Sequence, residues 1–203
     1  MGLLGFQGDV SEHKTALLKA SKNRGMNITV REIRKDSDMN NISGLIIPGG
    51  ESTTIYNLIN SYGLYARIKN EGMNGLPIWG TCAGLIIISK NTGDDRVIGM
   101  DLLDVEVERN AYGRQINSFI SELDISRIGK FEGVFIRAPV ISHVGDVEVM
   151  AYHNEKPVMV RHMNYIGTTF HPELTDDTRI HELFLDLVER EGYTSTGNNK
   201  GDN

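Results

Sequence analysis

The sequence PIWGTCAGLIII, residues 77–88, joins an apolar strand to an apolar helix through a turn that has a glycine at each end. The segment from Gly80 to Gly84 has the form glycine-x-nucleophile-x-glycine, which is typical of a nucleophile elbow. In such a turn the glycines let the strand and helix backbones approach closely, and the central side chain projects from the carboxyl end of the sheet. We therefore expect Cys82 at the carboxyl edge of a sheet; a buried cysteine in a glycine-rich turn is the plainer alternative.

The rest of the chain predicts an α/β fold, because apolar runs of strand length alternate with stretches of helical spacing. In the first half we expect strands at residues 2–6, 28–33, 44–47 and 77–79, helices at 11–24, 52–62 and 83–90, a short helix ending near 71, and a loop at 35–43. In the second half we expect strands at residues 105–108, 119–125, 134–136, 147–150, 158–160 and 165–170, and a last helix at 176–190. This order favours a single three-layer domain of the flavodoxin-like kind, with a mixed, mostly parallel central sheet and helices on both faces. We assign residues 1–193 to this domain and expect the polar residues 194–203 to be a disordered tail.

The composition and net charge of the chain argue against some classes of binding partner. It has 203 residues with Lys+Arg 21 and Asp+Glu 27, which gives a formal net charge of -6. An acidic balance without a basic cluster argues against nucleic acid and anionic membranes as main partners. We find no secretory signal and no apolar run near the ~20 residues that span a bilayer. Cys82 is the single cysteine, so no intrachain disulfide can form, and we expect a cytoplasmic protein.

A nucleophilic thiol needs a base, and the base needs a group that orients it. His171-Pro172-Glu173 directly follows the strand expected at residues 165–170, which puts both side chains at the sheet edge expected for Cys82. One residue separates His171 from Glu173, so an imidazole–carboxylate contact is geometrically easy. An isolated His-Pro-Glu is more typical of a protein surface, and the hypothesis therefore rests on the pairing with Cys82.

A second glycine-rich turn, Pro48-Gly49-Gly50, follows the strand expected at residues 44–47. Backbone amides in such a turn can face a ligand at the sheet edge and supply an oxyanion donor. The plainer interpretation is an ordinary strand–helix turn in which Ser52 or Thr53 caps the helix, and both can hold at once. The turn lacks the lysine pattern of a phosphate-binding loop.

Two arginines, Arg109 and Arg137, stand at the ends of expected strands and could each bind a carboxylate bidentately. Considered alone, each is more typical of a surface salt bridge. The chain has no pair of cysteines and no His-Glu-x-x-His motif, so we expect neither a metal nor a cofactor.

Taken together, the segments 48–50, 80–84 and 171–173 resemble the class I, triad-type glutamine amidotransferases. Further segments make the resemblance closest to the glutaminase subunits of pyridoxal 5′-phosphate synthases, and it covers nearly the whole chain. These segments are GFQG at 5–8 with EH at 12–13, PGGESTT at 48–54, GTCAGLII at 80–87, VERNAYGRQ at 107–115, VFIRAP at 134–139 and FHPELT at 170–175.

The resemblance implies a role for each matching residue. Cys82 would attack the side-chain amide of L-glutamine, His171 would act as base and then acid, and Glu173 would orient His171. The backbone amides of Gly50 and Ala83 would hold the oxyanion. The positions that match glutamine-binding residues of the family are Gly50, Glu51, Ser52, Arg109, Ile136 and Arg137.

The resemblance also implies a partner. The glutamyl thioester would be hydrolysed to glutamate, and the ammonia would pass to a separate synthase subunit in a hetero-oligomer built on a dodecameric core. Gln7 lies in the segment that the family uses near the oxyanion turn and the partner, so it is a candidate coupling residue. Asp9 departs from the small apolar residue that is usual in that turn, which leaves the detail of the interface open.

Three alternatives remain at the level of the sequence. The chain could be the glutaminase subunit of another amidotransferase, of histidine or purine biosynthesis. It could be a non-catalytic regulatory module on the same fold, with the thiol as a redox sensor. It could also be a cysteine peptidase or esterase on a related fold.

Overall fold

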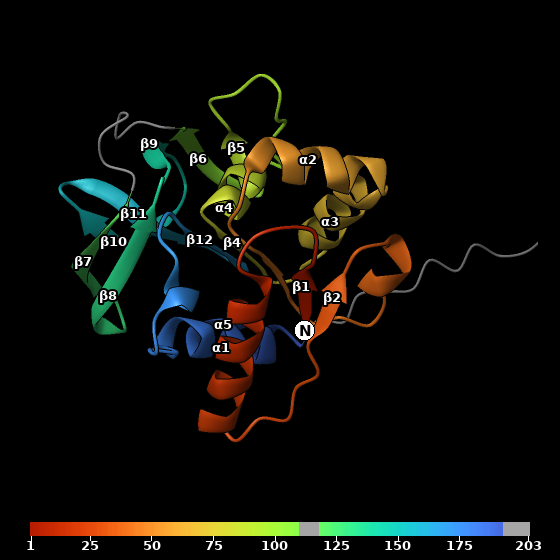
Figure 1. Cartoon of the computed structure of the whole chain (residues 1–203), viewed down its shortest axis with the longest axis horizontal. Helices are drawn as coiled ribbons and strands as arrows, with labels where there is room; N and C mark the ends of the chain where they lie inside the picture. Colours follow the sequence, from red (N-terminus) through yellow and green to blue (C-terminus); the bar gives the residue numbers. More distant parts are fainter. Residues whose placement is uncertain (110–117, 193–203) are drawn as a thin grey trace, which may run out of the picture.

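A seven-stranded sheet forms the centre of the computed structural model, which describes residues 1–109 and 118–192 (Figure 1). In spatial order its strands are β10 (Glu148–His153), β11 (Lys156–His162), β12 (Tyr165–Thr168), β4 (Ile78–Thr81), β3 (Leu45–Ile47), β1 (Gly2–Leu4) and β2 (Arg31–Ile33). The strands from β12 to β2 run parallel, whereas β11 is antiparallel to β12 and β10 is antiparallel to β11. The expectation of a mixed, mostly parallel sheet is confirmed.

Helices cover both faces of this sheet (Figure 1). One face carries α1 (Val10–Asn23) and α5 (Arg179–Glu191), and the other carries α2 (Ser52–Ser61), α3 (Leu64–Met73) and α4 (Ala83–Ile88). Successive strand residues point to opposite faces. Leu3, Ile46 and Trp79 accordingly pack in the core with α1 and α5, while Leu4 and Ile78 pack in the core with α2, α3 and α4. The three-layer α/β arrangement is thus as expected.

Two smaller sheets flank the central one. β5 (Ser89–Asn91), β6 (Leu103–Glu108) and β9 (Val140–Val144) form the first, and β7 (Ser118–Ile125) pairs with β8 (Gly129–Ile136) in the second. The sequence analysis missed β9 and wrongly extended the helix at residues 83–90 into β5. The helix ends earlier because the Ser89 hydroxyl donates to the backbone oxygen of Ile86 at 2.8 Å, a local bond that competes with the helical ladder.

Other boundaries also differ from the expected ones. The strand expected at residues 28–33 is only Arg31–Ile33, and the loop expected at 35–43 contains a 3-10 turn, η1 (Asp36–Met39). The last helix begins at Arg179, where the Asp177 carboxylate accepts from the backbone N–H of Arg179 at 3.0 Å. The tail expected at residues 194–203 lies outside the described residues. No helix in the described part of the chain combines the length and the apolar character needed to cross a membrane.

The turn between β4 and α4 depends on two backbone contacts that leave no room for a side chain. A Cβ atom on Gly84 would lie 1.9 Å from the carbonyl oxygen of Ile47, and a Cβ atom on Gly80 would lie 2.5 Å from the carbonyl carbon of Gly84. Both obstacles are backbone atoms, so they cannot move aside as the end of a side chain could. Gly80 and Gly84, at the two ends of the turn, therefore set how closely β3, β4 and α4 pack.

We expect Gly84→Ala to destabilise the protein by about 3 kcal/mol or to prevent folding, because the added methyl group forces β3 and α4 apart. Urea denaturation measures the change in the free energy of unfolding. Gly25→Asn is the matched control, because Gly25 has φ 65° with open space around it and asparagine tolerates that conformation. A Gly84→Ala protein as stable as the Gly25→Asn protein would contradict the packing argument.

Candidate active site

Cys82 occupies a strained turn at the carboxyl end of β4. Its backbone angles are φ 51° and ψ -102°, a left-handed φ that residues with a side chain seldom adopt. The backbone N–H of Cys82 donates to the carbonyl oxygen of Thr168 on β12 at 2.7 Å, which ties the turn to the neighbouring strand. Strain of this kind persists only where the surrounding structure enforces it, and it is typical of functional sites.

His171 and Glu173 reach the same edge from β12, which lies next to β4. The backbone N–H of His171 donates to the carbonyl oxygen of Val134 at 2.8 Å, and the 3-10 turn η2 (Pro172–Leu174) follows. Nδ1 of the imidazole lies 2.8 Å from Oε1 of Glu173, and both side chains are buried. The contact that the sequence spacing suggested is therefore present in the structure.

Asp9 places a second carboxylate beside the same imidazole. Its Oδ2 lies 3.2 Å from Nδ1 of His171. Burial lowers the pKa of His171, but hydrogen bonds with Asp9, Cys82 and Glu173 outweigh it and raise the pKa to about 12. The imidazole is therefore protonated at neutral pH, and a positively charged imidazole favours the thiolate form of a cysteine next to it. The sequence analysis had treated Asp9 only as a departure in a turn.

Behind Glu173 lies a buried pair of histidines that the sequence analysis did not identify as part of the site. Nε2 of His13 lies 3.4 Å from Oε2 of Glu173, and Nδ1 of His13 lies 3.1 Å from Nε2 of His181. The hydrogen-bond partners of the His13 ring are the Thr81 hydroxyl, at 3.3 Å from Nε2, and His181, whereas Oε2 of Glu173 accepts no hydrogen bond from the described residues. Burial lowers the pKa of His13 well below its ordinary value and that of His181 to about 3, so both rings stay neutral. The helical spacing of His13 on α1 gave no sign of this contact, because its partners come from η2 and α5.

A cavity of about 280 Å³ opens over Cys82 and His171. The predicted site residues that line it are Gly50, Glu51, Ser52, Cys82, Ala83, Arg109, Ile136, Arg137 and His171. Gln7 and Glu173 are absent from the lining, Glu173 because it lies behind His171. Gly8, Asp9, Ile86 and Pro139 also line the cavity and were not predicted as site residues.

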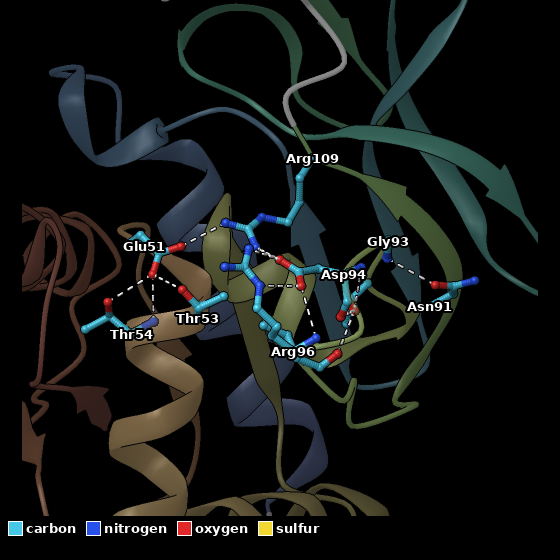
Figure 2. Close-up of polar contacts among 10 residues, drawn as sticks. Glu51, Thr53, Thr54, Asn91, Gly93, Asp94, Arg96 and Arg109 are labelled. Atoms are coloured by element: carbon cyan, nitrogen blue, oxygen red, sulfur yellow. Dashed lines mark hydrogen bonds and ion pairs between the residues drawn. The ribbon is translucent and has the colours of Figure 1, made fainter.

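The wall of the cavity at the start of α2 is charged and tightly bonded, as Figure 2 shows. The Glu51 carboxylate accepts from the backbone N–H of Thr54 at 2.7 Å and from the hydroxyl groups of Thr53 and Thr54. The expectation that Ser52 or Thr53 caps the helix is therefore wrong, because Glu51 is the capping residue. Burial raises the pKa of Glu51, but these hydrogen bonds lower it to about 2, so the group is ionised. Its Oε1 accepts from Nη2 of Arg109 at 2.8 Å.

Two further polar groups stand near the glycine turn at Gly50. The Ser52 hydroxyl is buried and has no hydrogen-bond partner among the described residues, although Ser52 lines the cavity. The Gln7 side chain accepts from the backbone N–H of Glu51 at 3.2 Å. The segment at Gln7 therefore contacts the glycine turn directly.

Within the described residues, Asp9, His171 and Glu173 form a group whose ligand-type atoms lie within 4.8 Å of one another. A metal ion there would have to replace the existing contacts between the imidazole and the two carboxylates. The arrangement fits a hydrogen-bonded base better than it fits a metal centre, since the imidazole nitrogen already faces both oxygens at 2.8 and 3.2 Å.

Comparison with known proteins identifies relatives over almost the whole chain. Residues 3–190 match the SNO glutamine amidotransferase family. The chain is 54% identical over 201 residues to a pyridoxal 5′-phosphate synthase subunit PdxT of Thermoplasma acidophilum, covering 98% of each. It is 55% identical over 196 residues to the PdxT subunit of Thermoplasma volcanium, covering 97% of this chain and 98% of that one. A crystal structure of a glutamine amidotransferase superposes with a TM-score of 0.83 at 41% identity, over 93% of this chain and 98% of that one.

The buried histidines predict how stability depends on pH. The pKa of His181 is about 3 in the folded protein and near 6.5 when unfolded, so between these values the unfolded chain binds the extra proton. Stability is therefore complete above about pH 6.5 and decreases below it, with a slope that approaches about 1.4 kcal/mol per pH unit for one histidine. His181→Gln keeps a donor for His13 but cannot titrate. We expect the free energy of unfolding of the wild type to fall more steeply than that of His181→Gln between about pH 7 and about pH 5.

Urea denaturation across this pH range measures the difference in the free energy of unfolding between the wild type and His181→Gln. The contributions of groups that titrate in both proteins cancel in this difference. His143→Gln replaces an exposed histidine on β9 and serves as the control for exchanging a histidine for glutamine. Parallel curves for the wild type and His181→Gln would contradict the assignment of a neutral buried histidine.

Proposed function

Because this chain belongs to the SNO glutamine amidotransferase family, we propose that it hydrolyses L-glutamine through Cys82, His171 and Glu173 and delivers the ammonia to the synthase subunit of a pyridoxal 5′-phosphate synthase. The observation that carries this proposal is the position of the strained Cys82 and the paired His171 on one cavity. The chain is a glutamine amidotransferase, and the residue roles below are part of the proposal.

The first half of the reaction forms a thioester. The thiolate of Cys82 attacks the carboxamide carbon of glutamine, and the carbonyl oxygen becomes an oxyanion. The backbone N–H groups of Gly50 and Ala83 bind this oxyanion, a role supported by the fact that both residues line the same cavity as Cys82. His171 then gives its proton to the amide nitrogen, the C–N bond breaks, and ammonia leaves.

The second half releases glutamate. His171, now neutral, takes a proton from a water molecule, and the hydroxide attacks the thioester carbon. The C–S bond breaks, glutamate forms, and the proton on His171 again lies beside the Cys82 thiolate. Glu173 holds the imidazole through Nδ1 in both halves, which leaves Nε2 for the proton transfers.

The charged wall of the cavity suits the head group of an α-amino acid. Arg109 offers a cation for the α-carboxylate and Glu51 offers an anion for the α-ammonium group, while Ile136 and Arg137 also line the cavity. The unpartnered hydroxyl of Ser52 supports a ligand contact, because a buried polar atom without a partner costs free energy until something binds it.

The choice of partner rests on the relatives. The two Thermoplasma proteins are named as subunits of pyridoxal 5′-phosphate synthase, which favours that synthase over one of histidine or purine biosynthesis. We propose a hetero-oligomer on a dodecameric synthase core in the cytoplasm, with Gln7 as the coupling residue because it contacts the backbone of the oxyanion turn.

We expect Cys82→Ser to lower the release of ammonia from glutamine on the order of 10⁴-fold, because the hydroxyl is a far weaker nucleophile in this turn. A coupled ammonia assay, run with and without the synthase subunit, measures the rate. Turnover undiminished by the substitution would rule out the thioester route. Full wild-type activity in the absence of the synthase would count against the coupling through Gln7.

For Glu173→Gln we expect a loss in kcat on the order of 10³- to 10⁴-fold, because the amide no longer fixes the charged imidazole. Glu122→Gln is the matched control, since Glu122 pairs with Lys130 on the exposed hairpin of β7 and β8, away from the cavity. Equal activity of the two variants in the same ammonia assay would refute the role of Glu173.

A further inference from the structure

Asp94 lies behind the charged wall of the cavity and joins two arginines (Figure 2). Its Oδ2 accepts from Nη1 of Arg109 and, at 2.7 Å, from Nη2 of Arg96. Its Oδ1 accepts from Nε of Arg96 at 2.9 Å and from the backbone N–H of Arg96 at 3.0 Å. Asp94 does not line the cavity, yet its side chain is only 11% exposed. Asp94 therefore contacts Arg109, which lines the cavity, without lining the cavity itself.

The loop between β5 and β6 is built to hold Asp94 in this place. The Thr92 hydroxyl bonds to the carbonyl oxygens of Val97 at 2.7 Å and Asp94 at 3.0 Å. The backbone N–H of Gly93 donates to the Asn91 side chain at 3.0 Å. A Cβ atom on Gly93 would lie 2.4 Å from the carbonyl oxygen of Val107, so the loop rests directly on β6, the strand that leads to Arg109.

Charges of opposite sign alternate along this network, from Arg96 through Asp94 and Arg109 to Glu51. The hydrogen bonds from Arg96 hold the pKa of Asp94 well below its ordinary range, so its carboxylate stays ionised. Nη1 of Arg109 is engaged by Asp94, and Nη2 faces the cavity beside Glu51. A free arginine side chain has many conformations, and the contact with Asp94 selects one before the substrate arrives.

We propose that Asp94 is a positioning residue for glutamine recognition, which fixes the Arg109 guanidinium so that Nη2 and Glu51 together present one cation and one anion to the zwitterionic head group of the substrate. This inference rests on the proposed function, because it assigns Arg109 to the α-carboxylate of glutamine. Asp94 would therefore act in substrate binding and take no part in the chemistry at Cys82.

The test is the steady-state kinetics of glutamine hydrolysis by the full chain with the synthase subunit. We expect Asp94→Asn to raise KM for glutamine about tenfold, the effect of losing a hydrogen bond to a charged group, with kcat changed by less than about twofold. The rate at which iodoacetamide alkylates Cys82 should stay unchanged, because this reagent has no amino-acid head group. Asp104→Asn is the control. Asp104 on β6 pairs with Lys90 on β5, and it does not line the cavity.

A double variant separates positioning from a general structural effect. Arg109→Gln should itself raise KM, and adding Asp94→Asn to it should raise KM no further, because Asp94 acts only through Arg109. Three outcomes would overturn the inference. KM could stay unchanged in Asp94→Asn, kcat and the alkylation rate could fall equally in that variant, or KM could rise further in the double variant than in Arg109→Gln. A wild-type complex that releases no ammonia from glutamine would instead refute the proposed function.

Discussion

The site depends on the parallel alignment of four neighbouring strands, β12, β4, β3 and β1, whose carboxyl ends meet at one edge of the sheet. His171 follows β12, Cys82 follows β4, Gly50 follows β3, and the turn with Asp9 follows β1. Backbone hydrogen bonds fix the register of these strands, and this register brings the segments after them to the same edge of the sheet. This is the general reason why open α/β sheets bind ligands beyond the carboxyl ends of their strands.

The buried polar groups divide into a charged part and a neutral part. Near the cavity, two carboxylates share one imidazole, and the positive charge on His171 compensates much of their repulsion. Deeper in the protein, His13 and His181 lie where burial keeps both rings neutral. Neutral imidazoles beside Glu173 add no second charge to a region that excludes water, where an unpaired charge would be costly.

The sequence alone was sufficient for the fold class and for most members of the candidate site. Apolar runs of strand length can be recognised in the local sequence. Positions where a close backbone contact requires glycine can also be recognised there, as at Gly80 and Gly84. The sequence alone therefore assigns the segments around Cys82 and His171 to one edge of the sheet. Element boundaries were less accurate, because single hydrogen bonds such as that of the Ser89 hydroxyl decide where a helix stops.

Only the tertiary structure decided which residues support the site from behind. Asp9 lies in the turn before α1, His13 lies in α1, and Asp94 lies in the loop before β6. Each contacts a residue of the candidate site that belongs to another element or segment. Aspartate and histidine are common on protein surfaces, so their local sequence does not distinguish a solvated side chain from one that contacts a residue of the candidate site. The sequence thus determined the strands and the turns that follow them, and the packing of those strands determined which distant side chains meet, because such contacts depend on distances that no local pattern encodes.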